Sequence, residues 1–221
     1  MIAMTWVSMD IKQYKGLIVL SKQVVILLHG VGSNGKDLSA LGDFWKPVLP
    51  DTVFLSPDAP FHFDQGGEGF QWFSLIGVTS ENRPQRIYQA RKSFDETINR
   101  IFSEQGIDPD RDKVVFVGFS QGSIMSLDAL VRSRYPLAGV VAFSGRLSSP
   151  QPHEKNYQTP VFLVHGKSDP VIPWSESEKA KQQLTDLGFN VEARYEDHTQ
   201  HTISPEGAKA AAEFIQKCFS E

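Results

Sequence analysis

Six short apolar segments constrain the fold of this chain more than any other feature of its sequence. They are rich in β-branched and aromatic residues and nearly unbroken by polar ones: Val24–Leu28, Val53–Ser56, Val114–Gly118, Gly139–Phe143, Val161–His165 and Val191–Tyr195. Continuous apolarity indicates strands that are buried on both faces, because a strand with one solvated face alternates apolar and polar residues. The pattern therefore predicts a parallel sheet covered by helices.

Segments of helical period separate these predicted strands. One apolar stripe recurs every three or four residues: Ile87, Ala90, Phe94, Ile98 and Ile101. It stops near Gly106, a second stripe stops at Gly188, and a third follows Ser204 and Pro205, which suit the start of a helix. The alternation predicts the α/β class, with a mostly parallel central sheet and helices on both faces. We expect one domain spanning residues 1–221.

Composition excludes several classes of function. The net charge of −4 leaves no positive excess for nucleic acid, and the longest apolar run, Val24–Leu28, is far below the ~20 residues of a membrane-spanning helix. The first twenty residues do not resemble a secretory signal, so a cytoplasmic location is expected. A single cysteine, Cys218, excludes an intramolecular disulfide and a cysteine-rich metal site. We find no sequence signature of a metal or organic cofactor.

The segment 118–122 has the pattern G-x-S-x-G, with Ser120 at its centre. It follows the predicted strand Val114–Gly118 and precedes a helix-forming run, which is the order of a nucleophile elbow. The close backbone contacts of such a turn leave no room for a Cβ at positions 118 and 122, where this chain has glycine. The alternative is that Ser120 merely caps a helix after a flexible turn, but the flanking elements favour a catalytic nucleophile.

A serine hydroxyl needs a base to take its proton, and histidine is suited to that role. Where a nucleophile elbow joins strand to helix, the acid and then the base follow it in the chain. Asp169 lies just past the predicted strand Val161–His165, and His198 and His201 follow it. Their place in the fold does not separate these two histidines. We favour His201 because a capped helix start at Ser204 would anchor it. The alternatives are that Asp169 starts a turn and that His201 is a surface residue.

An oxyanion formed on the substrate needs backbone N–H donors. One candidate is the N–H of Gln121, directly after the nucleophile. The other is the N–H of Val31, in the glycine-containing segment His29-Gly30-Val31-Gly32 after an early strand. We interpret His29 as a structural residue that holds this loop.

Together these motifs resemble the phospholipase/carboxylesterase family of α/β-hydrolases, which includes the acyl-protein thioesterases and small bacterial carboxylesterases. The matching segments appear in family order along most of the chain: Leu28–Gly32, Pro57–Pro60, Trp72-Phe73, Gly118–Gly122, Ser144-Gly145, His165-Gly166 with Asp169, and His201–Ser204. The resemblance implies Ser120, Asp169 and His201 as the catalytic triad and the amides of Val31 and Gln121 as oxyanion donors. It also prefers His201 to His198, implies no cofactor, and makes a homodimer a further expectation.

The chain departs from the family pattern at three positions. Gln200 stands where a glycine commonly precedes the base, Ser74 where aspartate often follows the Trp-Phe pair, and Ser123 in place of a frequent glycine. The segment 71–75 looks more like the bacterial branch of the family than the eukaryotic thioesterases.

The long segment 57–80 is rich in aromatic residues that follow neither helical nor strand period. An irregular apolar loop beside a catalytic serine predicts a lid or a wall for an acyl chain, with Trp72 and Phe73 as the first candidates for substrate binding. The alternative is that these rings complete the core under a long loop.

These features predict a serine hydrolase that cleaves carboxylic esters of short to medium acyl chains through an acyl-enzyme, with thioesters or lysophospholipids as further substrates. One rival is a peptidase or lactonase on the same scaffold, which would keep the triad and change the pocket. Another is a non-catalytic small-molecule-binding protein, a class that usually loses a triad member.

Overall fold

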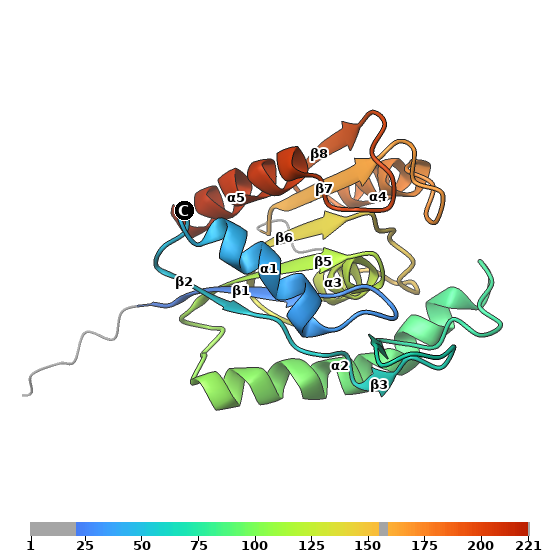
Figure 1. Ribbon diagram of the computed structural model, residues 1–221, viewed down its shortest axis with the longest axis horizontal. Coiled ribbons are helices and arrows are strands. Elements are labelled where there is room, and N and C mark those ends of the chain that lie inside the picture. Colours follow the sequence, from blue (N-terminus) through green and yellow to red (C-terminus); the bar gives the residue numbers. More distant parts are fainter. Residues whose placement is uncertain (1–20, 155–158, 221) are drawn as a thin grey trace, which may run out of the picture.

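A computed structural model describes residues 21–154 and 159–220. Within these residues, six strands form a parallel sheet in the order β2-β1-β5-β6-β7-β8 (Figure 1). The strands are β1 (Gln23–Leu28), β2 (Thr52–Leu55), β5 (Lys113–Phe119), β6 (Leu137–Phe143), β7 (Val161–Gly166) and β8 (Val191–Glu196). All six predicted strands are confirmed, with bounds within two residues of those expected.

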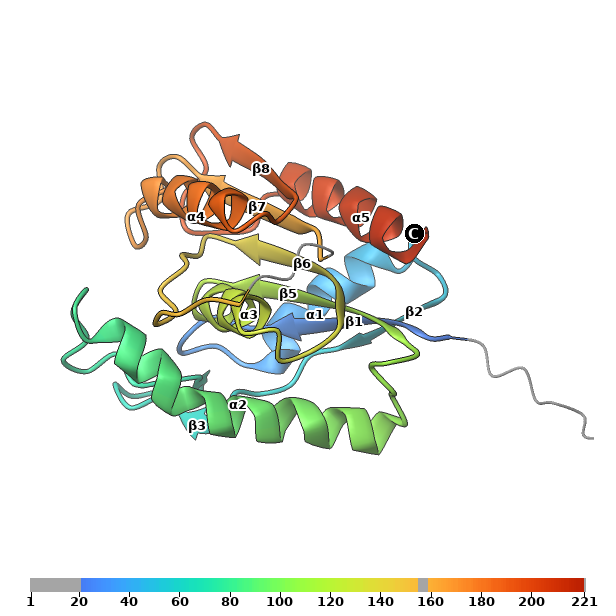
Figure 2. The same cartoon turned by 180° about the vertical axis from the view of Figure 1, so that it is seen from behind.

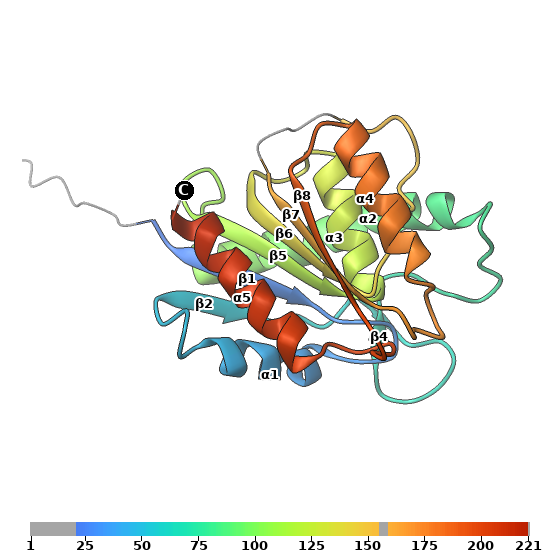
Figure 3. The same ribbon diagram turned by 90° about the horizontal axis from the view of Figure 1, so that it is seen from above.

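Helices cover both faces of the sheet, as predicted (Figures 2 and 3). One face carries α1 (Gly35–Trp45) and α5 (Pro205–Ser220), and the other carries α2 (Arg83–Gln105), α3 (Gln121–Val131) and α4 (Ser175–Asp186). Gly106 ends α2 in the left-handed conformation, with φ 57°. Cys218 is buried in the core between α5 and the sheet. Among the described residues, none of the helices combines the length and apolarity that a membrane span requires.

The expectation that every strand is buried on both faces holds for the centre of the sheet and is wrong at its edges. All but the end residues of β1, β5 and β6 are almost entirely buried, whereas β8 alternates partly buried and exposed residues, and Val53 of β2 is 39% exposed. Edge strands have one neighbour and fewer covering helices, so part of their surface stays in solvent.

The segment 57–80 contains two short strands, β3 (Phe61–His62) and β4 (Phe70–Gln71), which pair with each other in an antiparallel hairpin. This segment lies at the carboxyl end of the sheet beside the first turns of α2 (Figures 1 and 2). The loops that follow the parallel strands meet at the same end, where ligands of open α/β sheets are usually bound.

Candidate active site

Ser120 lies at the sharp turn between β5 and α3. Its φ of 54° and ψ of −112° belong to neither helix nor strand and are strained for a residue with a side chain. A Cβ added to Gly118 would lie 2.4 Å from the Ser123 nitrogen, and one added to Gly122 would lie 1.9 Å from the Leu28 oxygen. The backbone contacts of the turn therefore require both glycines, for the reason predicted.

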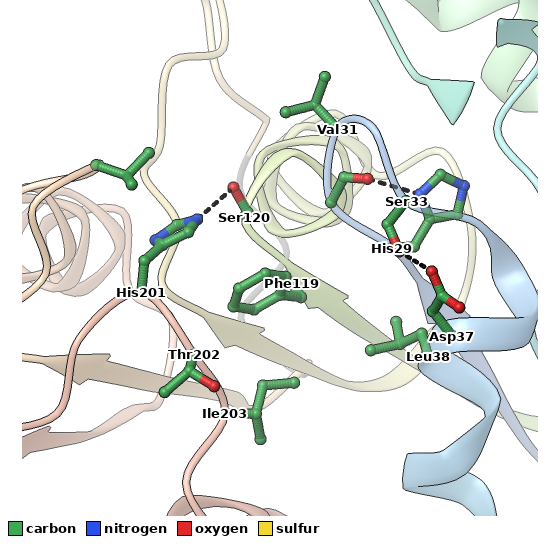
Figure 4. A pocket seen from close by; sticks show the side chains of 12 residues that line it. His29, Val31, Ser33, Asp37, Leu38, Phe119, Ser120, His201, Thr202 and Ile203 are labelled. Atoms are coloured by element: carbon green, nitrogen blue, oxygen red, sulfur yellow. Dashed lines mark hydrogen bonds between the residues drawn. The ribbon is translucent and has the colours of Figure 1, made fainter. Parts of the chain in front are cut away.

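The structure brings Ser120, Asp169 and His201 into one hydrogen-bonded chain. His201 Nε2 lies 2.9 Å from Ser120 Oγ, a contact drawn in Figure 4, and His201 Nδ1 lies 2.6 Å from Asp169 Oδ2. Position in the loop alone did not decide between His198 and His201 as the candidate base. In the structure, His201 is the one that contacts Ser120. His198 is exposed, with a φ of 62°.

The loop that carries His201 is fixed at its far end. Ser204 Oγ accepts a hydrogen bond of 2.8 Å from the Gly207 amide and so caps α5, as expected. The same hydroxyl donates a bond of 2.6 Å to Glu196, at the end of β8. Because both ends of the loop are held, His201 has little freedom to move away from Ser120.

Asp169 is a fully occupied hydrogen-bond acceptor. Its Oδ1 accepts from the amides of Val171 (2.8 Å) and Ile172 (2.9 Å), and its Oδ2 accepts from His201 and from His165 Nε2 at 3.1 Å. Burial alone would raise the pKa of Asp169. The hydrogen bond from His201 and those from the two amides outweigh burial, so that the pKa of Asp169 lies below its ordinary value. The carboxylate therefore stays charged in the folded protein at neutral pH.

The two predicted oxyanion donors lie on either side of Ser120. Val31 lines the cavity that contains Ser120, and Gln121 is the first residue of α3. Among the described residues, neither amide donates a hydrogen bond outside the regular helices and strands. The neighbouring loop is held firmly, because Gly32 N donates to Phe70 O at 2.8 Å and Phe70 N donates to Ser33 O at 2.7 Å. Both amides are thus available to a ligand in a rigid setting.

His29 is a structural residue that holds the loop after β1, as we interpreted from the sequence. It is buried, its Nδ1 lies 2.7 Å from Gly30 O, and its Nε2 accepts the Ala59 amide at 2.9 Å. Burial lowers the pKa of His29, so the ring is neutral, with its proton on Nδ1. Both ring nitrogens are used by the backbone, which leaves neither for Ser120.

Trp72 and Phe73 lie elsewhere than expected. Trp72 is 1% exposed, donates from Nε1 to His29 O at 2.9 Å, and packs against Phe94 of α2. Neither residue lines the cavity that contains Ser120; they border a separate one beside α2. Their backbones are tied to the Gln121 side chain, which accepts from Trp72 N and donates to Phe73 O, both at 2.7 Å. The geometry favours the alternative weighed for these rings, a place in the core.

The cavity beside Ser120 has a volume of about 400 Å³ and a largely apolar lining. Its apolar walls come from the loop after β1, from α1, from the end of β5, and from the loops that carry Asp169 and His201: Val31, Leu38, Phe119, Val171 and Ile203. Phe119 also packs against the His201 ring, with centroids 5.0 Å apart. Figure 4 shows Ser120 and His201 facing each other at one side of this space. A small apolar ligand with one polar reacting group fits such a lining.

Within the ranges 21–154 and 159–220, no three His, Cys, Asp or Glu side chains are grouped so that they could hold a metal ion.

Sequence reasoning missed two side chains behind the triad. His165 contacts Asp169 directly, and Ser177 contacts His165 on its other ring nitrogen. From the sequence, His165 ends a predicted strand without an obvious acidic residue before it at a strand end, so it is no candidate for the base. Its spacing, four residues before Asp169 on the same strand end, was the available signal.

Known proteins similar to this chain bear the names of esterases and thioesterases. The sequence model of the family described as Phospholipase/Carboxylesterase matches residues 19–219. The chain is 29% identical to esterase YpfH of Escherichia coli (strain K12) over 198 residues, covering 89% of this chain and 83% of the relative. It is 33% identical to acyl-protein thioesterase 1 of Kluyveromyces lactis over 176 residues, covering 73% and 76% respectively. The crystal structure of esterase PE8 matches with a TM-score of 0.80 at 34% identity, covering 90% of this chain and 94% of that one.

Proposed function

We propose, from the premise that the chain belongs to the phospholipase/carboxylesterase family, that its hydrolysis of carboxylic esters or thioesters proceeds through an acyl-enzyme on Ser120. The observation that carries the proposal is the continuous hydrogen-bonded chain from Ser120 Oγ through both nitrogens of His201 to Asp169. In this arrangement Ser120 is the nucleophile, His201 the general base, and Asp169 the carboxylate that fixes the His201 tautomer.

In the first half of the reaction, Ser120 Oγ attacks the carbonyl carbon and its proton passes to His201 Nε2. The carbonyl electron pair moves to oxygen, where the amides of Val31 and Gln121 stabilise the negative charge. Collapse of this intermediate breaks the bond to the leaving oxygen or sulfur, which takes the proton from His201. Water then attacks the acyl-enzyme as His201 takes its proton. The bond from the acyl carbon to Ser120 Oγ breaks, Oγ receives the proton from His201, and the carboxylic acid leaves.

The lining of the cavity supports apolar acyl groups of short to medium length. Its volume of about 400 Å³ lies at the lower end of the ~300–1,000 Å³ usual for small-molecule sites. We therefore expect p-nitrophenyl esters of short to medium chains to be cleaved faster than long ones, with matched thioesters tested beside them. Cleavage of peptides or lactones in preference to all of these esters would favour the rival enzyme on this scaffold.

The mechanism is tested by labelling with a fluorophosphonate, followed by peptide mapping. The reagent should modify Ser120 stoichiometrically and abolish ester hydrolysis, while Ser120→Ala should be neither labelled nor active. Labelling at another serine, or activity that persists in Ser120→Ala, would refute the nucleophile. Tight ligand binding with no hydrolysis of any ester would support the binding-protein alternative.

Several expectations complete the proposal. We propose a single domain over residues 1–221, a small acyl ester as the partner, no nucleic-acid partner, and a cytoplasmic location, the last supported by the single cysteine. Segment 57–80 supplies no residue to the lining of the Ser120 cavity, so we propose that it supports the Val31 loop from behind. A homodimer, expected from the family resemblance, is tested by light scattering of the purified protein.

A further inference from the structure

Asp169 has a second imidazole partner besides the base. His165 Nε2 lies 3.1 Å from the same carboxylate oxygen, Oδ2, that His201 Nδ1 contacts at 2.6 Å. The two rings differ in their surroundings, since the His165 side chain has no exposed area and that of His201 is 17% exposed. One oxygen of the proposed triad is thus shared between a ring that faces the cavity and a ring buried behind it.

The hydrogen bonds of His165 define where its proton lies. Nε2 contacts two acceptors, Asp169 Oδ2 and Ile172 O at 2.9 Å, so this nitrogen carries the proton. Nδ1 lies 2.6 Å from Ser177 Oγ. Burial lowers the pKa of His165, which keeps the ring neutral. The Ser177 hydroxyl can donate to Nδ1 or to Gly145 O at 3.2 Å; because Nε2 carries the ring proton and the contact with Nδ1 is shorter, Nδ1 accepts it. His165 is therefore a neutral donor aimed at Asp169, with its tautomer fixed from both ends.

A donor in this position changes what Asp169 offers to the base. The backbone amides of Val171 and Ile172 occupy Oδ1, so Oδ2 is the oxygen that faces His201. A second hydrogen bond to Oδ2 stabilises the carboxylate and reduces its attraction for a proton on His201. Without it, Asp169 would hold His201 more strongly in the imidazolium form, which cannot act as a base.

We propose, on the basis of the Ser120 mechanism above, that His165 is a positioning residue that limits the pull of Asp169 on His201 and so sets the pH at which the base becomes neutral. His165 acts through Asp169 and touches neither Ser120 nor the substrate cavity. Charged groups near this cluster include Arg146, after β6, with its partner Glu176 of α4 at 3.5 Å, and Asp37 of α1, which lines the same cavity as His201. None of them is altered by a substitution at position 165, so they do not mask its effect.

The test compares His165→Leu, which removes the donor, with His165→Gln, whose side-chain amide can donate to Asp169 from a similar position. In His165→Leu the acidic limb of the pH profile of kcat/KM should move to higher pH by roughly one unit, about tenfold in the protonation equilibrium. The plateau at high pH should fall much less than activity at neutral pH. His165→Gln should restore the original limb, and Ser177→Ala, which leaves Nε2–H in place, should stay close to it.

An unshifted limb in His165→Leu, with a loss of activity equal at every pH, would overturn the proposal and assign His165 to packing alone. Should His165→Leu fail to fold, His165→Asn provides the same comparison, because its shorter amide ends before the position of Nε2. The titration midpoint of the His201 ring, followed by NMR, gives a readout independent of turnover. If the unaltered chain hydrolyses no ester and Ser120 is not labelled, the proposed function fails, while this titration still decides the role of His165.

Discussion

Two buried aspartates, Asp169 at the carboxyl end of the sheet and Asp128 in α3, show two ways in which this fold holds a carboxylate. Neither side chain has exposed area. Asp128 pairs with Arg91, through bonds of 2.8 and 3.0 Å, and with Arg134 at 3.2 Å. Asp169 has two imidazoles and two backbone amides instead. The first carboxylate is neutralised by charges that are always present, and the second is held by imidazole rings and backbone N–H groups.

The different partners of the two carboxylates indicate different roles: we expect Asp128 to contribute to stability and Asp169 to catalysis. A guanidinium keeps its charge at every pH of interest. Asp128 of α3 therefore stays paired with Arg91 of α2 and with Arg134, which follows α3, over that whole range. An imidazole gains charge only when it takes a proton. In the proposed mechanism, the negative charge of Asp169 is therefore available for the imidazolium that forms on His201 when Ser120 attacks, which is when its stabilisation lowers the barrier.

The largest effect on activity is expected for His201, the imidazole that is hydrogen-bonded to Asp169. His201→Ala should lower kcat by about 10⁶-fold, as is typical when the base of a serine triad is removed. His198→Asn is the matched control, because asparagine tolerates the φ of 62° at that position and the side chain is exposed. Its steady-state kinetics should match those of the unaltered chain. The reverse pattern in the two variants would assign the base to His198.

Asp169→Asn should lower kcat by about 10⁴-fold, because an amide stabilises the wrong tautomer of His201 and offers no charge to the imidazolium. Its unfolding free energy should fall by no more than about 1–3 kcal/mol, the cost of one mismatched buried hydrogen bond. Urea denaturation measured beside the kinetics separates the two quantities. If Asp169→Asn lost stability in proportion to activity, the contrast with Asp128 would disappear.

Asp128→Ala should give the opposite result. Removing it leaves Arg91 and Arg134 without their shared buried partner, which should lower the unfolding free energy by about 3–5 kcal/mol. At a temperature where the variant is folded, kcat should be nearly unchanged, because no contact joins this cluster to Ser120. A loss of kcat with unchanged stability would contradict the division of roles.

The smallest effect concerns a third buried aspartate, Asp112, at the amino end of β5. Burial alone would raise its pKa, but hydrogen bonds from Arg111 and the amides of Asp108 and Lys22 outweigh burial and hold the pKa at about 2. Since this value is depressed, the stabilisation is present above the unfolded pKa near ~3.9 and is lost as the pH falls toward 2.

The difference in unfolding free energy between the unaltered chain and Asp112→Asn should accordingly be about 2 kcal/mol at pH 6 and shrink between pH 4 and pH 2. Activity above pH 5 should be unaffected. A difference that stays constant down to pH 2 would show that Asp112 contributes by shape alone.

Much of the fold could be predicted because its signals are local. The apolar runs gave the six strands, and the helical stripes with Gly106 and Ser204 gave the ends of helices. The short hairpin β3–β4 and helix α1 were not predicted. The hairpin strands have two residues each, too few to show a period. In α1 only Trp45 is a fully buried apolar side chain, with Leu38 and Leu41 partly buried beside it.

The candidate site divides in the same way. The constraint on Gly118 arises within five residues of chain, from Gly122 and Ser123, and could be predicted from local sequence. The constraint on Gly122 comes from Leu28 of the neighbouring strand β1, and only the motif indicated it. Trp72 and Phe73 were expected at the acyl pocket and lie in the core instead, since the contacts of Trp72 with His29 and Phe94 depend on how distant segments pack. In an irregular loop there is no hydrophobic period from which the direction of an aromatic side chain could be inferred.

The sequence by itself determined the six strands of the main sheet, the turn that presents Ser120 and the chain order of Ser120, Asp169 and His201. Only the tertiary structure decided that His201 reaches Ser120 while His198 faces solvent, and that His165 shares a carboxylate oxygen with it. The physical reason is the distance along the chain over which each feature is determined. A periodic pattern records the backbone of one segment, whereas a hydrogen bond between residues 81 positions apart depends on strand register and loop path together.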